Sequence, residues 1–257
     1  MEELLLMLET KNLNTEYYKD MLIDIYLLTG KYSKAVDIII YKVEKDEQNY
    51  MNTLQRLHNY IGEPELVGSI QKKVYGKYSQ NQNSEKWTQM AMWLSQATKD
   101  YEESLQIAKA YDKRTSGNGA YVLSISEVAF YDEQFDVAIS GYRYLSGIQT
   151  NNAMAKLGAE REIESYYALL RSNLKTNPML IDTMEIRLSQ YFNKYSMDHT
   201  TADMQILRAE LLVKYRSRIK EAIGILERLT SLTNLAVERK SRALLNLGDY
   251  KLIDDDI

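Results

Sequence analysis

The feature that most constrains this chain is a pattern in which an aromatic residue is followed, three positions later, by a small one. It occurs from Tyr32 to Ala35, from Tyr101 to Ser104 and from Phe135 to Ala138, with weaker copies starting at Pro64 and Ile219. The first four copies recur about every 34 residues, and the longer gap before Ile219 leaves room for one longer, degenerate copy. A fixed period of this length is typical of stacked supersecondary units.

Each copy follows a turn between two helical patterns. Before Gly30, apolar residues such as Leu22 and Tyr26 recur at helical spacing, and after the turn Ala35 and Ile39 do the same. A small residue lets two helices approach closely, and the ring three positions earlier fills the wedge beside the turn. Because neither helix can bury its apolar stripe alone, the hairpins are expected to stack on their neighbours.

The residues of these copies resemble the tetratricopeptide repeat (TPR), a helical hairpin with a period of about 34 residues. One copy matches the signature positions of the family with Leu22, Tyr26, Gly30, Tyr32, Ala35 and Ile39, and a second with Ile125, Ala129, Phe135, Ala138, Tyr142 and Leu145. Leu247-Gly248 resembles the Leu-Gly pair of a first helix. The signature Trp and the closing Pro of the family are mostly missing.

The resemblance implies an all-α fold, a right-handed α-α superhelix (solenoid) of TPR-like hairpins that occupies residues 1–257 as a single array. Hairpins are expected at 15–46, 50–79, 84–114, 119–148, 153–195 and 201–230, followed by an unpaired helix at 236–253. Polar breaks separate these segments, and Ser84, Asn152 and Thr201 are the expected N-caps. A solenoid usually ends in a polar cap, so the unpaired helix favours a chain cut from a longer protein, and an exported bacterial protein is one parent that we consider.

Catalytic and metal-binding groups are sparse in the sequence. There is no cysteine, and the two histidines, His58 and His199, are far apart and lie in no metal-ligand pattern, so we expect no metal site, no cofactor and no enzyme activity. The glutamates at 160, 162 and 164 could suggest acid–base chemistry, but surface ion pairs with Arg161 or Lys156 are the favoured interpretation.

The overall charge argues against a general nucleic-acid binder. Lys and Arg number 32 and Asp and Glu 36, which gives a net charge of −4 and no basic footprint for phosphates. No apolar run approaches the length of a membrane-spanning helix, and we expect no signal peptide in the N-terminal segment. The compartment stays unknown, since the parent protein could still be exported.

Ligand-contacting side chains of the family come from recurring positions on the first helix of each hairpin, which lines the concave groove. By resemblance these positions are Tyr17, Asp20 and Asp24 in the first repeat, Lys86, Gln89 and Trp93 in the third, and Leu123, Glu127 and Phe130 in the fourth. One known use of such a groove is to grip a peptide's terminal carboxylates with Lys, Asn and Arg. Asp20 and Asp24 would repel a carboxylate there, so that use is not expected. Trp93 is either a peptide anchor in the groove or a filler of the core.

Charge is also unevenly distributed along the sequence. Residues 1–66 carry 7 basic and 12 acidic side chains, a net −5, whereas residues 206–242 carry 9 basic and 4 acidic ones, a net +5. This asymmetry suggests either steering of an acidic partner, head-to-tail self-association, or two ordinary solvated faces. The basic patch that would do the steering consists of Arg208, Lys214, Arg216, Arg218 and Lys220.

Two functions are consistent with these observations. The first is a non-catalytic scaffold that binds a protein or peptide of unknown identity in its concave groove. The alternative is an accessory or regulatory docking segment of a larger multidomain bacterial protein, for which export is one option. An enzyme of unfamiliar all-α type is a distant third, because no cluster of titratable groups is visible.

Overall fold

A computed structural model describes residues 15–45, 54, 57–172 and 177–255 of the chain. Within these ranges the regular structure is entirely helical and no strand is present, which confirms the expected all-α class. The first helix of the second expected hairpin, near residue 50, lies largely outside the described residues.

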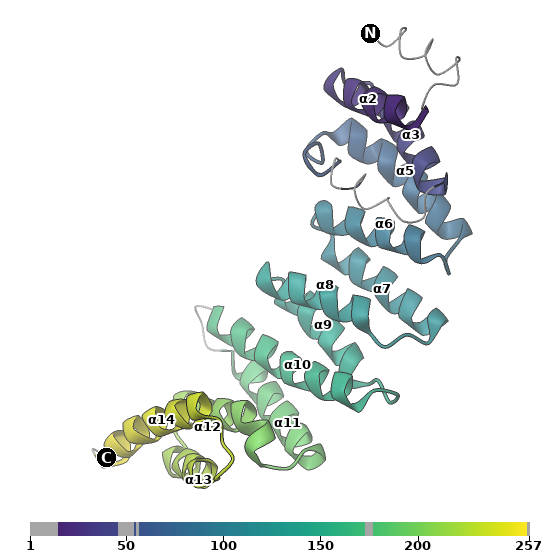
Figure 1. Ribbon diagram of the computed structural model, residues 1–257. Helices are drawn as coiled ribbons and strands as arrows, with labels where there is room; N and C mark the ends of the chain where they lie inside the picture. Colours follow the sequence, from purple (N-terminus) through teal and green to yellow (C-terminus); the bar gives the residue numbers. More distant parts are fainter. Residues whose placement is uncertain (1–14, 46–53, 55–56, 173–176, 256–257) are drawn as a thin grey trace. The chain divides into compact units, whose positions relative to one another are not determined.

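The described helices follow one another along the chain (Figure 1). They are α2 (Thr15–Leu28), α3 (Tyr32–Lys45), α5 (Pro64–Gln80), α6 (Glu85–Ala97), α7 (Tyr101–Thr115), α8 (Ala120–Tyr131), α9 (Phe135–Ser146), α10 (Asn152–Ser172), α11 (Pro178–Lys194), the 3-10 helix η1 (His199–Thr201), α12 (Ala202–Arg216), α13 (Ile219–Thr230) and α14 (Val237–Asp255).

The described chain divides into two compact units, which meet in the sequence between Ile125 and Ser126, inside α8. In unit 1, α2 packs on α3, α3 on α5, α5 on α6 and α6 on α7. In unit 2, neighbouring helices from α9 to α14 contact one another, and α12 also contacts α14. This neighbour-to-neighbour packing is compatible with a helical repeat. The expected single array across both units stays a prediction.

The small residues of the recurring pattern lie inside the packed core of the helices. Ala35, Ser104, Ala138 and Ala222 are all fully buried. Gly158 of α10 makes the closest approach, because a Cβ added there would meet the backbone nitrogen of Ser146 at 2.6 Å. The packing role predicted for the small positions is consistent with this burial.

Unit 2 has two hydrophobic clusters that meet at α12. One joins α10, α11 and α12 through residues such as Tyr167, Met184 and Leu211. The other joins α12, α13 and α14 through Ala202, Ile206, Leu212, Ile225, Leu226, Ala243 and Leu247. Helix α12 therefore buries apolar side chains on two sides.

Most helix boundaries agree with the expected ones to within two residues, whereas the capping predictions fare less well. Ser84 and Thr201 are the N-cap residues of α6 and α12, but neither side chain makes a capping hydrogen bond. Asn152 is inside α10, and the side chain of Asn151 instead accepts the hydrogen bond from the backbone N–H of Met154. Residues 173–176, inside the expected hairpin 153–195, lie outside the described residues.

Candidate functional site

The nine side chains expected to line a groove are all accessible to solvent in the structure. Tyr17 and Asp24 are exposed, and the other seven are partly buried. They lie on α2, α6 and α8, each of which is a first helix of an expected hairpin. The first seven belong to unit 1, and Glu127 and Phe130 belong to unit 2.

On α2 one predicted position, Asp20, contacts the second helix of the hairpin. The Asp20 carboxylate pairs with the Lys42 ammonium of α3 at 2.6 Å. On α6 the Lys86 ammonium donates to the backbone carbonyl of Val43 at 2.9 Å. Trp93 is partly buried, while Trp87 on the same helix is buried. The structure therefore does not place Trp93 fully in the core, and both interpretations of this residue stay open.

A contact between α6 and α8 links two first helices of unit 1. The Tyr121 hydroxyl donates to the Glu85 carboxylate, and the Gln89 amide contacts the same hydroxyl. Burial, together with the hydrogen bond to Glu85, raises the pKa of Tyr121 to about 12. The phenol stays neutral at ordinary pH and acts as a donor that holds the two helices together.

Phe130, near the end of α8, belongs to an aromatic group in unit 2. Its ring centroid lies 5.7 Å from that of Phe135 and 5.9 Å from that of Tyr131, in edge-to-face arrangements. Tyr131 is largely exposed. Such a rigid aromatic surface loses little side-chain entropy when it binds a partner.

An open hollow of about 600 Å³ lies on the α2–α3 hairpin of unit 1. The described residues that line it include Lys19, Leu22, Tyr26, Lys34 and Tyr41. The Lys19 ammonium lies 4.2 Å from the centre of the Tyr41 ring, and a hydrogen bond with Lys45, with a second from Lys19, lowers the pKa of Tyr41. This hollow involves a different stripe of α2 from Tyr17, Asp20 and Asp24, and no pattern in the sequence indicated it.

In unit 2, a network of charged and polar side chains joins α10, α12 and α14. The Tyr167 hydroxyl of α10 donates to the Glu210 carboxylate of α12 at 2.8 Å. From α14, Arg242 pairs with Glu210 at 3.2 Å and Asn246 donates to it at 3.3 Å. Burial opposes ionisation of Glu210, but the hydrogen bonds from Tyr167 and Arg242 outweigh it and lower the pKa of this carboxyl.

Sequence reasoning missed the most buried charge of unit 2. Glu162 of α10 has a side chain that is 5% exposed, and its carboxylate pairs with Arg143 of α9 at 2.9 Å and with Arg187 of α11 at 3.3 Å. The neighbouring glutamates behave as expected: Glu164 pairs with Arg161 and Glu160 with Lys156. The even spacing of 160, 162 and 164, which sends Glu162 to a different face, was the available signal.

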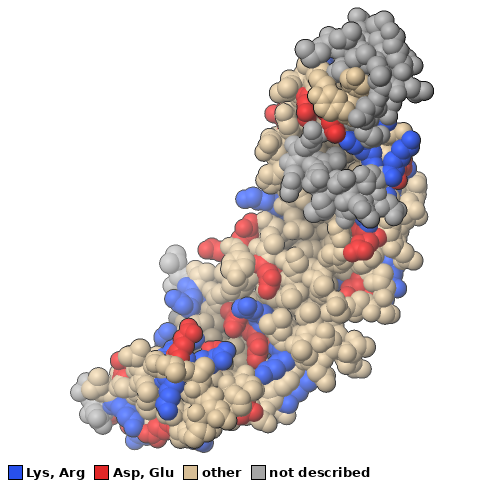
Figure 2. Space-filling model, in the orientation of Figure 1, with Lys and Arg blue, Asp and Glu red and all other residues tan. Residues whose placement is uncertain are grey.

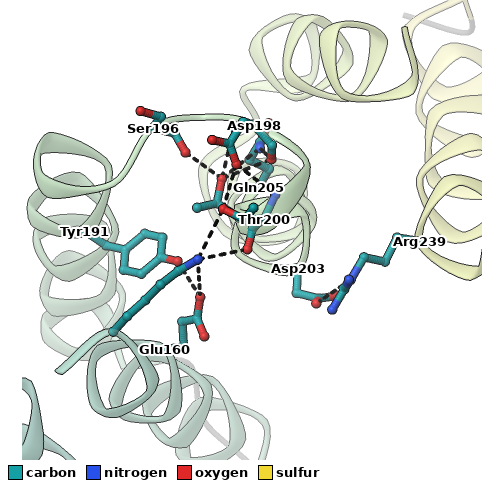
Figure 3. Close-up of polar contacts among 10 residues, drawn as sticks. Glu160, Tyr191, Ser196, Asp198, Thr200, Asp203, Gln205 and Arg239 are labelled. Carbon is teal, nitrogen blue, oxygen red and sulfur yellow. Dashed lines mark hydrogen bonds and ion pairs between the residues drawn. The ribbon is translucent and has the colours of Figure 1, made fainter. Parts of the chain in front are cut away.

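A polar cluster fixes the connection between α11 and α12. The Tyr191 hydroxyl donates to Glu160, and the Asp198 carboxylate accepts from the backbone N–H and the hydroxyl of Thr200 (Figure 3). The Lys156 ammonium also donates to the backbone carbonyl of Thr200 at 3.1 Å. These hydrogen bonds hold a loop in place and leave no convergent set of reactive groups there.

Most of the predicted basic patch is neutralised by nearby carboxylates. Arg216 pairs with Asp182 and Glu185, and Arg218 pairs with Glu185 and Glu221. Two further pairs join Arg208 to Glu221 and Lys214 to Glu210. Figure 2 shows acidic and basic side chains interspersed over this part of the face it presents. The ion pairs reduce the field that the sequence count of +5 suggested.

No group of three or more His, Asp or Glu side chains that could hold a metal ion occurs among the described residues. His58 and His199 are both exposed. Across the described ranges, no helix is both long and apolar enough to cross a bilayer.

Comparison with known proteins adds no family assignment. No protein-family model matches the chain, and no curated protein matches it significantly.

Proposed function

We propose that this chain is a TPR-like solenoid with a right-handed superhelix that binds a protein or peptide through the concave groove of its first helices. The observation that carries the proposal is a difference in burial between two sets of side chains. The small residues of the recurring pattern are fully buried between helices, whereas all nine predicted groove positions are accessible. A helical repeat whose packing positions are filled and whose first-helix faces are open is suited to binding an extended partner.

The aromatic residues are the best candidates for anchors. Trp93 and Phe130 are partly buried, so each has apolar surface that a partner could cover. Trp is enriched among the residues that contribute most to binding energy, and aromatic rings bury a large area with few rotatable bonds. The acidic side chains Asp24 and Glu127 would disfavour an acidic peptide and favour a neutral or basic one, whereas the charge of Asp20 is balanced by Lys42.

The test uses the full chain as bait in a native lysate. A Trp93→Ala/Phe130→Ala variant is compared with the wild type and with a Met179→Ala/Ile186→Ala control, which removes two exposed apolar side chains of α11, a helix that carries none of the predicted groove positions. Circular dichroism checks that all three proteins are folded. We expect the control to recover the same partners as the wild type and the groove variant to lose them. Equal recovery by the groove variant contradicts the proposal.

A further inference from the structure

Helix α14 carries apolar side chains on a face that no described helix covers. Val237, Leu244, Leu245 and Leu252 recur at a spacing that places them on one side of the helix. Their exposed fractions are 82%, 49%, 71% and 69%, in that order. Ser241 and Gly248 lie on the same side, and a Cβ added at Gly248 would meet nothing within 4 Å. We call this surface the outer face of α14.

The opposite side of α14 is packed in the ordinary way. Ala243, Leu247 and Tyr250 are buried in the cluster that α14 shares with α12 and α13. The outer face is therefore a second apolar surface on a helix that already has a buried one. Isolated exposed apolar residues are common on proteins, but four on one helix face indicate an interaction surface.

Helix α12 also has two apolar sides, and both of them are covered by other helices. One side of α12 contributes Met204, Leu207 and Leu211 to the cluster with α10 and α11. Its other side contributes Ile206 and Leu212 to the cluster with α13 and α14. The main cover on that second side is α13, a 12-residue helix whose buried residues Ala222, Ile225, Leu226 and Leu229 form a single stripe. An amphipathic helix of about three turns is thus the observed occupant of such a face.

The charged side chains beside the outer face indicate which charges a partner would carry. Lys240 lies on the flank nearer α13, where Lys251 on the same flank pairs with Glu227. Glu238 and Asp249 lie on the flank nearer α12, where Arg242 pairs with Glu210. Lys240, Glu238 and Asp249 themselves form no ion pair with any other residue that the structure describes. One flank therefore offers a basic group and the other offers acidic groups.

We propose that the outer face of α14 docks an amphipathic α-helix of a partner protein. The apolar stripe of that helix covers Val237, Leu244, Leu245 and Leu252 as α13 covers α12. It carries acidic side chains along the flank next to Lys240 and basic ones along the flank next to Glu238 and Asp249. None of the nine predicted groove residues lies on α14, so the two proposals are tested by different variants and either can fail without the other.

The probe is a fluorescently labelled peptide with the sequence of residues 218–231, which contains α13. Its binding to the full chain is followed by fluorescence anisotropy. We expect saturable binding to the wild type and at least tenfold weaker binding to a Leu245→Lys/Leu252→Lys variant. Both side chains are mostly exposed, so the variant is expected to keep its fold, and circular dichroism and the melting temperature check this. A Met179→Lys/Ile186→Lys variant makes the matched change on α11 and should bind as the wild type does.

Three results overturn the proposal. The first is a lack of saturable binding to the wild type, and the second is equal binding by the wild type and the α14 variant. The third comes from sedimentation without peptide: a dimer that the α14 substitutions abolish assigns the outer face to a second copy of this chain instead of a partner helix. A peptide carrying Leu226→Lys should bind at least tenfold more weakly, because its apolar stripe is interrupted.

Discussion

The two units differ in where they place their charges and how closely their helices approach. In unit 1, ion pairs such as Lys73–Asp37 and Lys77–Glu44 lie in solvent, and the helical glycines Gly68 and Gly76 have no neighbour within 4 Å of an added Cβ. Unit 2 also has exposed ion pairs such as Lys251–Glu227 and open helical glycines at Gly224 and Gly248, but it additionally buries a carboxylate between two arginines and packs Gly158 directly against the adjacent backbone. Exposed ion pairs contribute little to stability, whereas removing one partner of a buried ion pair is strongly destabilising. The difference suggests that the packing of the helices tolerates fewer substitutions in unit 2 than in unit 1.

The largest expected effect comes from Gly158, where α10 approaches α9. A Gly158→Val substitution places a Cβ 2.6 Å from the Ser146 nitrogen and 2.7 Å from the Leu145 Cβ. Because backbone cannot yield as a flexible side chain can, we expect a loss of about 3 kcal/mol or more in the free energy of unfolding. Urea denaturation followed by circular dichroism measures it. A loss below about 1 kcal/mol would show that the contact is looser than described.

Glu162 should show the next largest effect. A Glu162→Gln substitution removes the charge that Arg143 and Arg187 share. We expect a loss of about 2 kcal/mol, lower than for a fully buried pair because both arginines still reach water. The matched change in unit 1, Asp37→Asn, should cost less than about 0.5 kcal/mol, because both partners of its ion pair are exposed. Similar losses from the two substitutions would remove the distinction between the units.

Glu210 makes the stability of unit 2 depend on pH. Its pKa in the folded protein is lowered, so its contribution is present above the unfolded value of about 4.5 and is lost as pH falls through the folded value. We expect the free energy of unfolding of a Glu210→Gln variant to depend less on pH below pH 4.5 than that of the wild type. At pH 7 we expect it to be about 1 kcal/mol lower than in the wild type. Denaturation at a series of pH values measures both. If the free energy of unfolding changed with pH in the same way in the variant and the wild type, the network around Glu210 would not contribute to stability.

The smallest effect should be a gain. Gly76 lies inside α5 with open space around it, so a Gly76→Ala substitution removes only the entropic cost of glycine in a helix. We expect the free energy of unfolding to rise by about 0.5 to 1 kcal/mol. A loss at this site would indicate a neighbour of α5 that the open space does not show. The melting temperature of this variant, beside that of Gly158→Val, contrasts the packing of the two units directly.

The sequence was sufficient to predict the helices and their order but not the connections between distant side chains. Apolar spacing around Tyr32, Phe135 and Ile219 correctly predicts a helix on each side of these turns, because local periodicity determines which face a helix buries. The partners of Glu162 were not predictable, because they come from two other helices and the pairing depends on how all three helices pack. The ion pairs of Arg216 and Arg218 were missed for the same reason, since a count of charges ignores neighbouring helices.

The candidate groove illustrates the same limit. Family resemblance selects positions on first helices, and these positions prove accessible, but it does not reveal their contacts. The hydrogen bonds of Tyr121 and the hollow beside Tyr41 depend on residues from neighbouring helices. The outer face of α14 was visible in the sequence as an unpaired helix, whereas the exposure of its leucines required coordinates.

The bonds between tyrosine hydroxyls and carboxylates also give the protein a response to alkali. Tyr121 donates to Glu85, Tyr167 to Glu210 and Tyr191 to Glu160, and in each case burial, followed by the hydrogen bond to the carboxylate, raises the phenol's pKa above 10. A group with a raised pKa contributes its full stabilisation below the unfolded value near 10 and loses it as pH rises through the folded value, which is about 12 for Tyr121. Strong base would turn each donor into a phenolate facing a carboxylate, so helices that these tyrosines hold together would repel one another.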